Sequence, residues 1–264
     1  MDEKRKVLEL VEKGLISADE ALELLEALEN AERQAAAPDL LEAEEGDGSL
    51  FHLDVNVTGA DIYLAVGDGE KVTVVKEGKG ADRIQVEEGP MYLRLYERRE
   101  IGWERLLLPS VSASARVRVT LPRSFRLRGQ VRTVSGDVQG ELPSGRDLLL
   151  RTVSGDMDLM GAFAAVEAHS VSGDLRLRMK ALFPDGLRVS LHTVSGDVRL
   201  VLPRGTYGIR GQGSAVSGDV DLELPGVERK KQGVSYSFHR AGDPAVDLRF
   251  KTVSGDVAVR EGVV

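Results

Sequence analysis

Six aspartates recur in this chain, each as the last residue of the tetrapeptide Val-Ser-Gly-Asp. If every copy turns the same corner, their carboxylates form a column with neighbours about 5 Å apart. Such a column is a candidate calcium site, but calcium-binding repeats carry several acidic residues and glycines per turn, and this one carries one of each. We therefore expect the aspartates to cap turns by accepting backbone N–H bonds. The column comprises Asp137, Asp156, Asp174, Asp197, Asp219 and Asp256.

A second column stands two positions before the valine of each repeat and is mostly basic. It comprises Arg132, Arg151, His169, His192, Ser214 and Lys251. Alternation along a strand points these side chains toward solvent. A solvated face with weak salt bridges is the simpler interpretation, and a column that binds a glycan or another polyanion is the alternative.

The sequence offers no constellation of catalytic residues. The four histidines lack metal-ligand spacing, the repeat serines have no general base nearby, and phosphate-binding or dinucleotide-binding fingerprints are missing. We expect no catalytic residue, no metal and no cofactor. A polysaccharide-cleaving β-helix enzyme is the least favoured function, because the one set of carboxylates is periodic and periodicity indicates a structural role.

The spacing of the tetrapeptide predicts the elements that position these columns. Its copies begin at Val134, Val153, Val171, Val194, Val216 and Val253. A turn that recurs with a period near 20 residues is typical of a β-solenoid, in which each repeat is one coil stacked on the last. Period-two counting predicts that Thr133 and Ser135 point inward and Val134 outward. The glycine that follows is expected to need a positive φ. The same roles are predicted for the turn residues Ser135, Gly136, Ser154, Gly155, Ser172, Gly173, Ser195, Gly196, Ser217, Gly218, Ser254 and Gly255, each pair followed by its aspartate.

Three regions are expected along the chain. Residues 1–36 read as an amphipathic helical hairpin, with a capping box at Ser17-Ala18-Asp19-Glu20, and residues 37–50 as an acidic linker. Residues 51–264 form the solenoid, with irregular first coils over 51–115 that include a degraded repeat at Val57-Thr58-Gly59-Ala60-Asp61, and with regular repeats over 116–264. Residues 226–243 are predicted to be an irregular coil or a protruding loop. No cover is apparent for the last strand, at 257–260.

Composition limits the partners. The chain has 264 residues and no cysteine, so disulfides and thiolate chemistry are excluded. Residues 1–50 carry a net charge of −10 and the remainder +2, which argues against nucleic-acid binding through the N-terminal segment. No apolar run is long enough to span a membrane, and the charged N-terminus is unlike a secretory signal. We expect a cytoplasmic protein, with peripheral association at a membrane as an alternative.

Aromatic and arginine side chains gather in the first coils. Tyr92, Tyr96 and Trp103 lie close in sequence to Arg98 and Arg99. Together they favour an interaction surface. Filling of the core and packing at turns is the preferred alternative.

Two parts of the chain resemble known bacterial domains. Val117-Arg118-Val119-Thr120-Leu121-Pro122, followed by repeated Thr-Val-Ser-Gly-Asp-Val, resembles the DUF4097 "putative adhesin" family. The segments at 3–8 and 12–21 resemble the short helical (SHOCT-like) domain that precedes it in some members, the YvlB type. The resemblance implies a mainly β fold, a right-handed, single-stranded parallel β-helix preceded by a small helical hairpin. It also implies a link to envelope-stress responses, and it supplies no catalytic residues.

These observations favour a non-enzymatic scaffold or interaction protein. Residues 1–36 would mediate self-association or docking to a protein partner, because a hairpin of this size is too small to stabilise itself. The flank of the solenoid would bind a partner. A carbohydrate- or polyanion-binding module is the alternative function.

Overall fold

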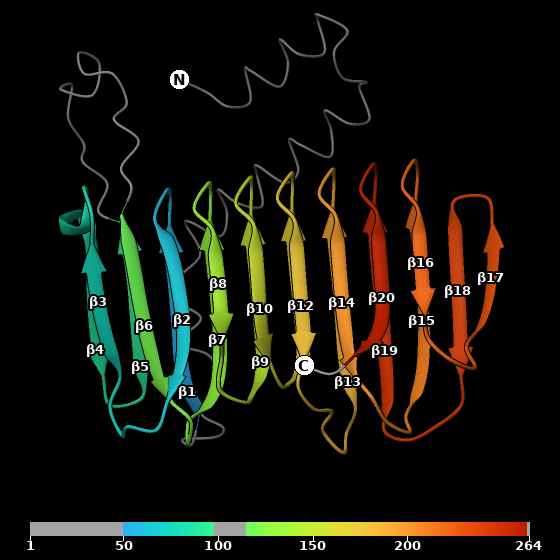
Figure 1. Ribbon diagram of the computed structural model, residues 1–264, viewed down its shortest axis with the longest axis horizontal. Coiled ribbons are helices and arrows are strands. Elements are labelled where there is room, and N and C mark those ends of the chain that lie inside the picture. The colour runs from blue at the N-terminus through green and yellow to red at the C-terminus, as the bar shows by residue number, and fades with distance from the viewer. Residues whose placement is uncertain (1–49, 98–114, 263–264) are drawn as a thin grey trace, which may run out of the picture. The chain divides into compact units, whose positions relative to one another are not determined.

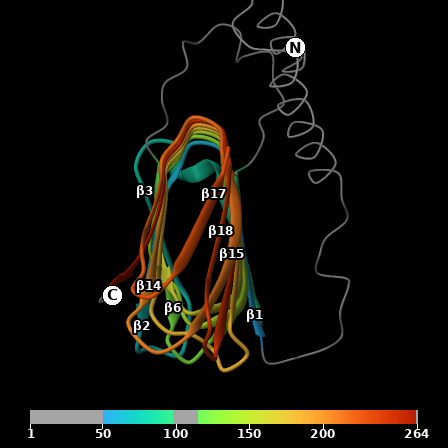
Figure 2. The same ribbon diagram turned by 90° about the vertical axis from the view of Figure 1, so that its right-hand side faces the viewer.

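The computed structural model describes residues 50–97 and 115–262, which form a β-solenoid of two facing sheets (Figure 1). Each coil contributes one strand to an 11-stranded sheet and the next strand to a 9-stranded sheet. Seen along the solenoid, the sheets meet at a narrow corner on one side and are joined by wider loops on the other (Figure 2). The predicted solenoid is confirmed. The predicted helical hairpin and nearly all of the linker lie outside the described residues.

The parallel strands of the 11-stranded sheet lead into the narrow corner. The members of this sheet, in spatial order, are β17 (Glu228–Gln232), β18 (Ser235–Arg240), β15 (Gly208–Ala215), β19 (Ala245–Thr252), β13 (Leu187–Thr193), β11 (Phe163–Ser170), β9 (Gly145–Thr152), β7 (Arg126–Thr133), β1 (Leu50–Val57), β5 (Tyr92–Glu97) and β4 (Ile84–Gly89). Strands β15 to β5 of this order run parallel. β18 and β17 at one end, and β4 at the other, pair antiparallel.

The strands of the 9-stranded sheet leave the corner, except β3 (Thr73–Glu77), which is antiparallel to its neighbour β6 (Arg116–Pro122). In spatial order they are β16 (Val220–Glu223), β20 (Val257–Gly262), β14 (Val198–Pro203), β12 (Leu175–Met179), β10 (Met157–Gly161), β8 (Val138–Glu141), β2 (Asp61–Gly67), β6 and β3. One short 3-10 helix, η1 (Ala81–Arg83), separates β3 from β4. No helix within residues 50–97 and 115–262 is long and apolar enough to cross a membrane.

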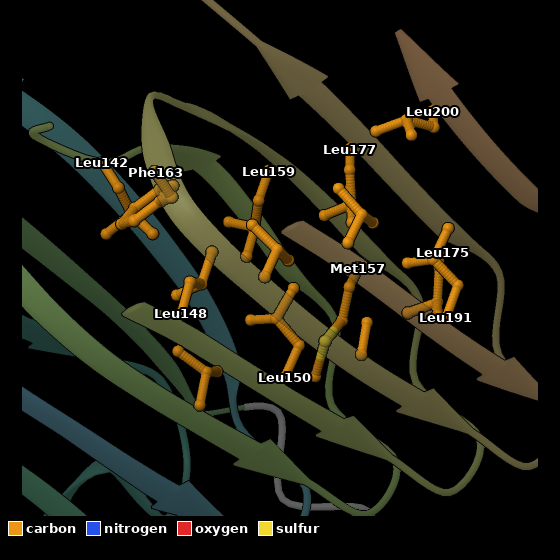
Figure 3. Packing of buried hydrophobic residues seen from close by; sticks show 14 of the residues in the cluster. Leu142, Leu148, Leu150, Met157, Leu159, Phe163, Leu175, Leu177, Leu191 and Leu200 are labelled. Carbon is orange, nitrogen blue, oxygen red and sulfur yellow. The ribbon is translucent and has the colours of Figure 1, made fainter. Parts of the chain in front are cut away.

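The core is a set of aliphatic rows that run across the coils. Period-two alternation puts every second residue of each strand inside, so equivalent positions of successive coils stack on one another. Leu150, Met157 and Leu175 lie in such rows between the two sheets (Figure 3). Because each coil buries its apolar face only against its neighbours, the stack stabilises itself along its length.

Coil order in space departs from coil order in sequence at both ends. The coil β19–β20 lies between β13–β14 and β15–β16, and the coil β1–β2 lies between β5–β6 and β7–β8 (Figure 1). The expectation that each coil stacks on the preceding one is therefore wrong for the repeat at Val216, which is separated from the coil of Val194 by the last coil, and for β7–β8, which stacks on β1–β2. The last strand, for which no cover was apparent, pairs with β14 on one side and β16 on the other.

Residues 226–243 are also more regular than predicted. They form the antiparallel hairpin β17–β18, whose second strand pairs with β15. Arg240 holds this hairpin in place. Its guanidinium donates to the carbonyl oxygens of Tyr207 and Pro225, forms an ion pair with Glu261 at 3.0 Å, and lies over the Tyr207 ring. This cluster couples the hairpin to the end of β20.

Candidate functional site

Each repeat turns the narrow corner with the same internal hydrogen bonds. Thr133 is buried, and its hydroxyl accepts from the Gly136 N–H at 3.0 Å and donates to the Gly136 carbonyl at 2.9 Å. Thr152, Thr193 and Thr252 form the same pair of bonds. The inward threonine and the outward valine were predicted correctly. The inward serine was wrong, because the chain stays outward for two successive residues, Val134 and Ser135, before Gly136 turns in.

The repeat glycines serve close packing rather than an unusual backbone conformation. None of the six has a positive φ, so that prediction was wrong. A Cβ on Gly155 would instead lie 2.1 Å from the carbonyl oxygen of Gly136 on the neighbouring coil. Glycine is required because the backbones of adjacent coils touch at this point.

The outward serines and aspartates tie each coil to its neighbour. The Ser154 N–H and hydroxyl both donate to the Val134 carbonyl, at 2.8 and 3.1 Å. The Asp156 N–H donates to Asp137 Oδ1 at 3.0 Å. The aspartates therefore accept backbone N–H bonds as predicted, although from the next coil and not from their own turn. The bonds run through seven aspartates in the spatial order Asp61, Asp137, Asp156, Asp174, Asp197, Asp256 and Asp219.

The calcium alternative gains no support from this arrangement. The Oδ1 atoms of neighbouring carboxylates accept hydrogen bonds from the backbone N–H groups of the next coil. The second carboxylate oxygen of each aspartate takes no part in these hydrogen bonds. Within the described parts of the chain, no group of three or more acidic or histidine side chains is placed to hold a metal ion.

The basic column lies on the outer face of the 11-stranded sheet, in one row beside the corner. Strand register aligns Arg132, Arg151, His169, His192 and Lys251 on five adjacent strands, followed by Ser214. Adjacent strands are about 4.8 Å apart, so these side chains are stacked neighbours. We call the five charged or ionisable members the basic column.

Arg132 and Arg151 are two like charges side by side. Neither forms an ion pair within 4 Å with any carboxylate of residues 50–97 and 115–262. Burial and the neighbouring Arg132 lower the pKa of Arg151, while Glu167 partly opposes the shift. The Arg132 Nε is buried without a hydrogen-bond partner among the described atoms. The arginine end of the column is thus rich in donors and poor in acceptors.

The middle of the column is a stacked pair of histidines. The rings of His169 and His192 lie 5.0 Å apart at an interplanar angle of 9°. His169 Nε2 is 2.8 Å from Glu167 Oε1, and His192 Nε2 is 3.2 Å from the Ser190 hydroxyl. Burial, and then the proximity of His169, lowers the pKa of His192. His192 is therefore mostly neutral at pH 7 and gains charge on acidification.

The row extends past the arginines to two residues that sequence reasoning missed. Asn56 pairs with Arg132, and Tyr96 pairs with Asn56, so an amide and a phenol continue the column toward β5. The degraded repeat at 57–61 was the signal for Asn56, since Asn56 stands five positions before Asp61 as Arg132 stands five positions before Asp137. The preferred core interpretation of Tyr92 and Tyr96 was wrong, because both lie on the outer face. Trp103, Arg98 and Arg99 lie outside the described residues.

Several known proteins and domains are similar to parts of this chain. Residues 2–33 match a SHOCT-like domain. A putative cell adhesion protein from Clostridium sporogenes is similar over 81% of this chain and 93% of its own, at 11% identity and a TM-score of 0.48. A putative adhesin from Bacteroides fragilis is similar over 80% and 94%, at 16% identity and a TM-score of 0.39. No curated protein matches the chain. Residues 126–260, about half of the chain, match the Toastrack DUF4097 family, and the chain belongs to that family.

Proposed function

We propose that this protein is a non-enzymatic interaction protein that binds a linear anionic polymer, such as an acidic glycan, along the basic column. The observation that carries the proposal is the pair Arg132 and Arg151, stacked without a carboxylate partner among the described residues. Two adjacent guanidinium groups repel each other, and an anion that bridges them removes that repulsion. Arginine also binds carboxylate and sulfate-like groups in a bidentate fashion.

The shape of the column supports a polymer over a single small anion. The five positions recur once per strand over five adjacent strands, which is about 20 Å of linear surface. No concave pocket is needed, since a chain of repeated charges can contact successive rungs. Tyr96 and Asn56, at one end of the row, supply the aromatic and amide groups that commonly contact sugars.

Two finer parts of the hypothesis stay predictions. Self-association or docking through residues 1–36 is one, and the match of residues 2–33 to a SHOCT-like domain is compatible with it. A role in envelope stress, with a cytoplasmic or membrane-peripheral location, is the other.

The test is titration of the full chain with a heparin-derived oligosaccharide at low and high salt. Arg132→Ala combined with Arg151→Ala is expected to weaken binding about tenfold or more, and binding by the wild type should weaken as salt is added. The matched control is Arg199→Ala, which removes an exposed arginine from β14 in the other sheet. Equal binding by the wild type and the double variant would refute the column as the site. Release of shortened fragments from the oligosaccharide would refute the non-enzymatic assignment.

A further inference from the structure

We propose that the solenoid associates head to tail with a second copy of this chain, by pairing of β17 on one copy with β4 on the next. The two strands are the outermost members of the 11-stranded sheet, one at each end. The inference does not use the basic column, although Glu87 of β4 accepts a hydrogen bond from Tyr96, which continues the row of that column.

Both strands have an edge that no other described strand covers. All five residues of β17, Glu228–Gln232, are exposed, and β4 exposes Glu87 and Glu88. An uncovered edge carries unpaired N–H and C=O groups, which makes it a template for another strand. Charged residues normally protect such edges, so the sign of the charge at each end decides what can approach.

The charges at the two ends are opposite. β17 carries Arg229, Lys230 and Lys231 with one glutamate, and β4 carries Glu87 and Glu88 without a basic residue. Contact between two β17 strands, or between two β4 strands, would bring like charges together, which is unfavourable. The arrangement therefore discourages symmetric end-to-end dimers and favours contact between unlike ends.

Strand polarity permits this contact. The central strands of the sheet are parallel, β4 is antiparallel to β5, and β17 returns to the direction of β15 after the antiparallel β18. A second copy translated along the solenoid would thus place β17 antiparallel to β4. In the other sheet, β3 is antiparallel to its neighbour β6 and β16 is parallel to β20, so β16 and β3 would also meet antiparallel.

Register matches the charges row by row. Following the paired residues strand by strand across the 11-stranded sheet, Lys230 lies in the same row as Glu87. Arg229 lies in the same row as Glu88 by the same path. A copy added without a shift in register therefore sets each basic residue opposite a glutamate.

Apolar side chains at the two ends of the 9-stranded sheet also lie in one row. Val74 of β3 and Leu222 of β16 are partly buried at opposite ends of one inner row of the 9-stranded sheet. Stacking would bury both of them and extend the core from one copy into the next. Because the two surfaces differ, the contact is heterologous and can repeat into an open chain of copies.

Cysteine cross-linking of the full chain tests the contact directly, since the chain has no cysteine of its own. The chain would carry both Lys230→Cys and Glu87→Cys. At the proposed contact, position 230 of one copy and position 87 of the next copy would lie at a Cα separation that a disulfide spans. Mild oxidation should give a ladder of dimers, trimers and larger species on a non-reducing gel. The matched control pairs Lys230→Cys with Arg199→Cys, whose exposed position lies on an interior strand of the other sheet. The same ladder from the control, or no ladder from the test pair, would overturn the proposal.

Charge reversal separates this contact from any association through residues 1–36. Light scattering should show that Lys230→Glu, which removes the net positive charge of β17 and puts a glutamate in the row of Glu87, weakens self-association of the full chain about tenfold or more at low salt. Glu87→Lys should do the same, and an equimolar mixture of the two variants should associate again, since each then offers an end of opposite sign to the other. Unchanged mass for both single variants, or no recovery in the mixture, would overturn the head-to-tail contact.

Discussion

A Cβ atom on Gly196 would lie 2.2 Å from the carbonyl oxygen of Gly173 on the neighbouring coil. The same approach recurs from Gly136 onward through the stack, at 2.0 to 2.2 Å. No real carbon–oxygen contact is that short, so a side chain at this position would push two coils apart. The absent side chain thus sets how closely coils stack at the corner, and with it the distance between rungs of the basic column.

Gly196→Ala should consequently destabilise the solenoid strongly. Overpacking against rigid backbone costs about 1–3 kcal/mol or more, because the carbonyl cannot rotate away as a side chain would. Urea unfolding followed by circular dichroism measures the change. Gly205→Ala is the matched control, since its added Cβ would meet no atom within 4 Å. A loss at Gly196 no larger than that at Gly205 would contradict this account of the corner.

Thr193→Val tests the buried hydroxyl bridge. The substitution keeps the side-chain volume but removes the group that pairs with both the N–H and the carbonyl of Gly196. Loss of a buried hydrogen bond with its partners left unsatisfied costs about 1–3 kcal/mol. Thr193→Ser keeps the hydroxyl and should be clearly milder, as the Ser170 hydroxyl already donates to the Gly173 carbonyl in another coil. Equal loss in both variants would show that packing of the methyl group, not the hydroxyl, stabilises the turn.

The repeat made the architecture predictable, because a fixed turn with alternating residues before and after it leaves few ways to arrange the coil. Thr133 inside, Val134 outside and a single row of basic residues all follow from period-two counting. The prediction for Ser135 failed because two successive outward residues at the corner interrupt the alternation of the strand. The role of Gly136 could not be derived from one coil, because the steric limit lies in the backbone of the next.

The spatial order of the coils could not be predicted from the sequence, for a different reason. The repeats at Val216 and Val253 are equivalent in pattern, so nothing in either indicates which one pairs with the coil of Val194. The long interval between them holds the hairpin β17–β18, and the antiparallel pairing of that hairpin with β15 places the last coil inside the stack. Charge matching between β17 and β4 depends on this order and could not be inferred before it.

Substitutions of Asp174 test whether the repeat aspartates are needed as hydrogen-bond acceptors or as negative charges. Its Oδ1 accepts from the Asp197 N–H at 2.9 Å, and its own N–H donates to Asp156. Asp174→Asn keeps the acceptor and removes one of several stacked charges, so thermal stability should be unchanged or slightly higher at low salt. Asp174→Ala removes the acceptor and should cost about 1 kcal/mol. If Asn were as damaging as Ala, the charge itself would be required, and calcium titration of the wild type would be the next measurement.

Acidification should lower the free energy of unfolding through protonation of His192. It should also raise the affinity of the basic column for an anionic polymer. The pKa of His192 is lowered in the folded protein by burial and by His169, with a further unfavourable contribution from Lys251 and an opposing one from Glu167. The unfolded chain therefore binds a proton at higher pH than the folded chain, so the stabilising contribution is complete above about pH 6.5 and is lost as pH falls through the lowered pKa.

An anionic polymer on the basic column favours the protonated ring, so heparin-oligosaccharide affinity should rise over the same pH range. His192→Ser, which introduces the residue found at position 214 of this row, should flatten both profiles relative to wild type. A wild-type affinity that stays level between pH 7.5 and 5.5 while stability falls would place the ligand away from the histidines.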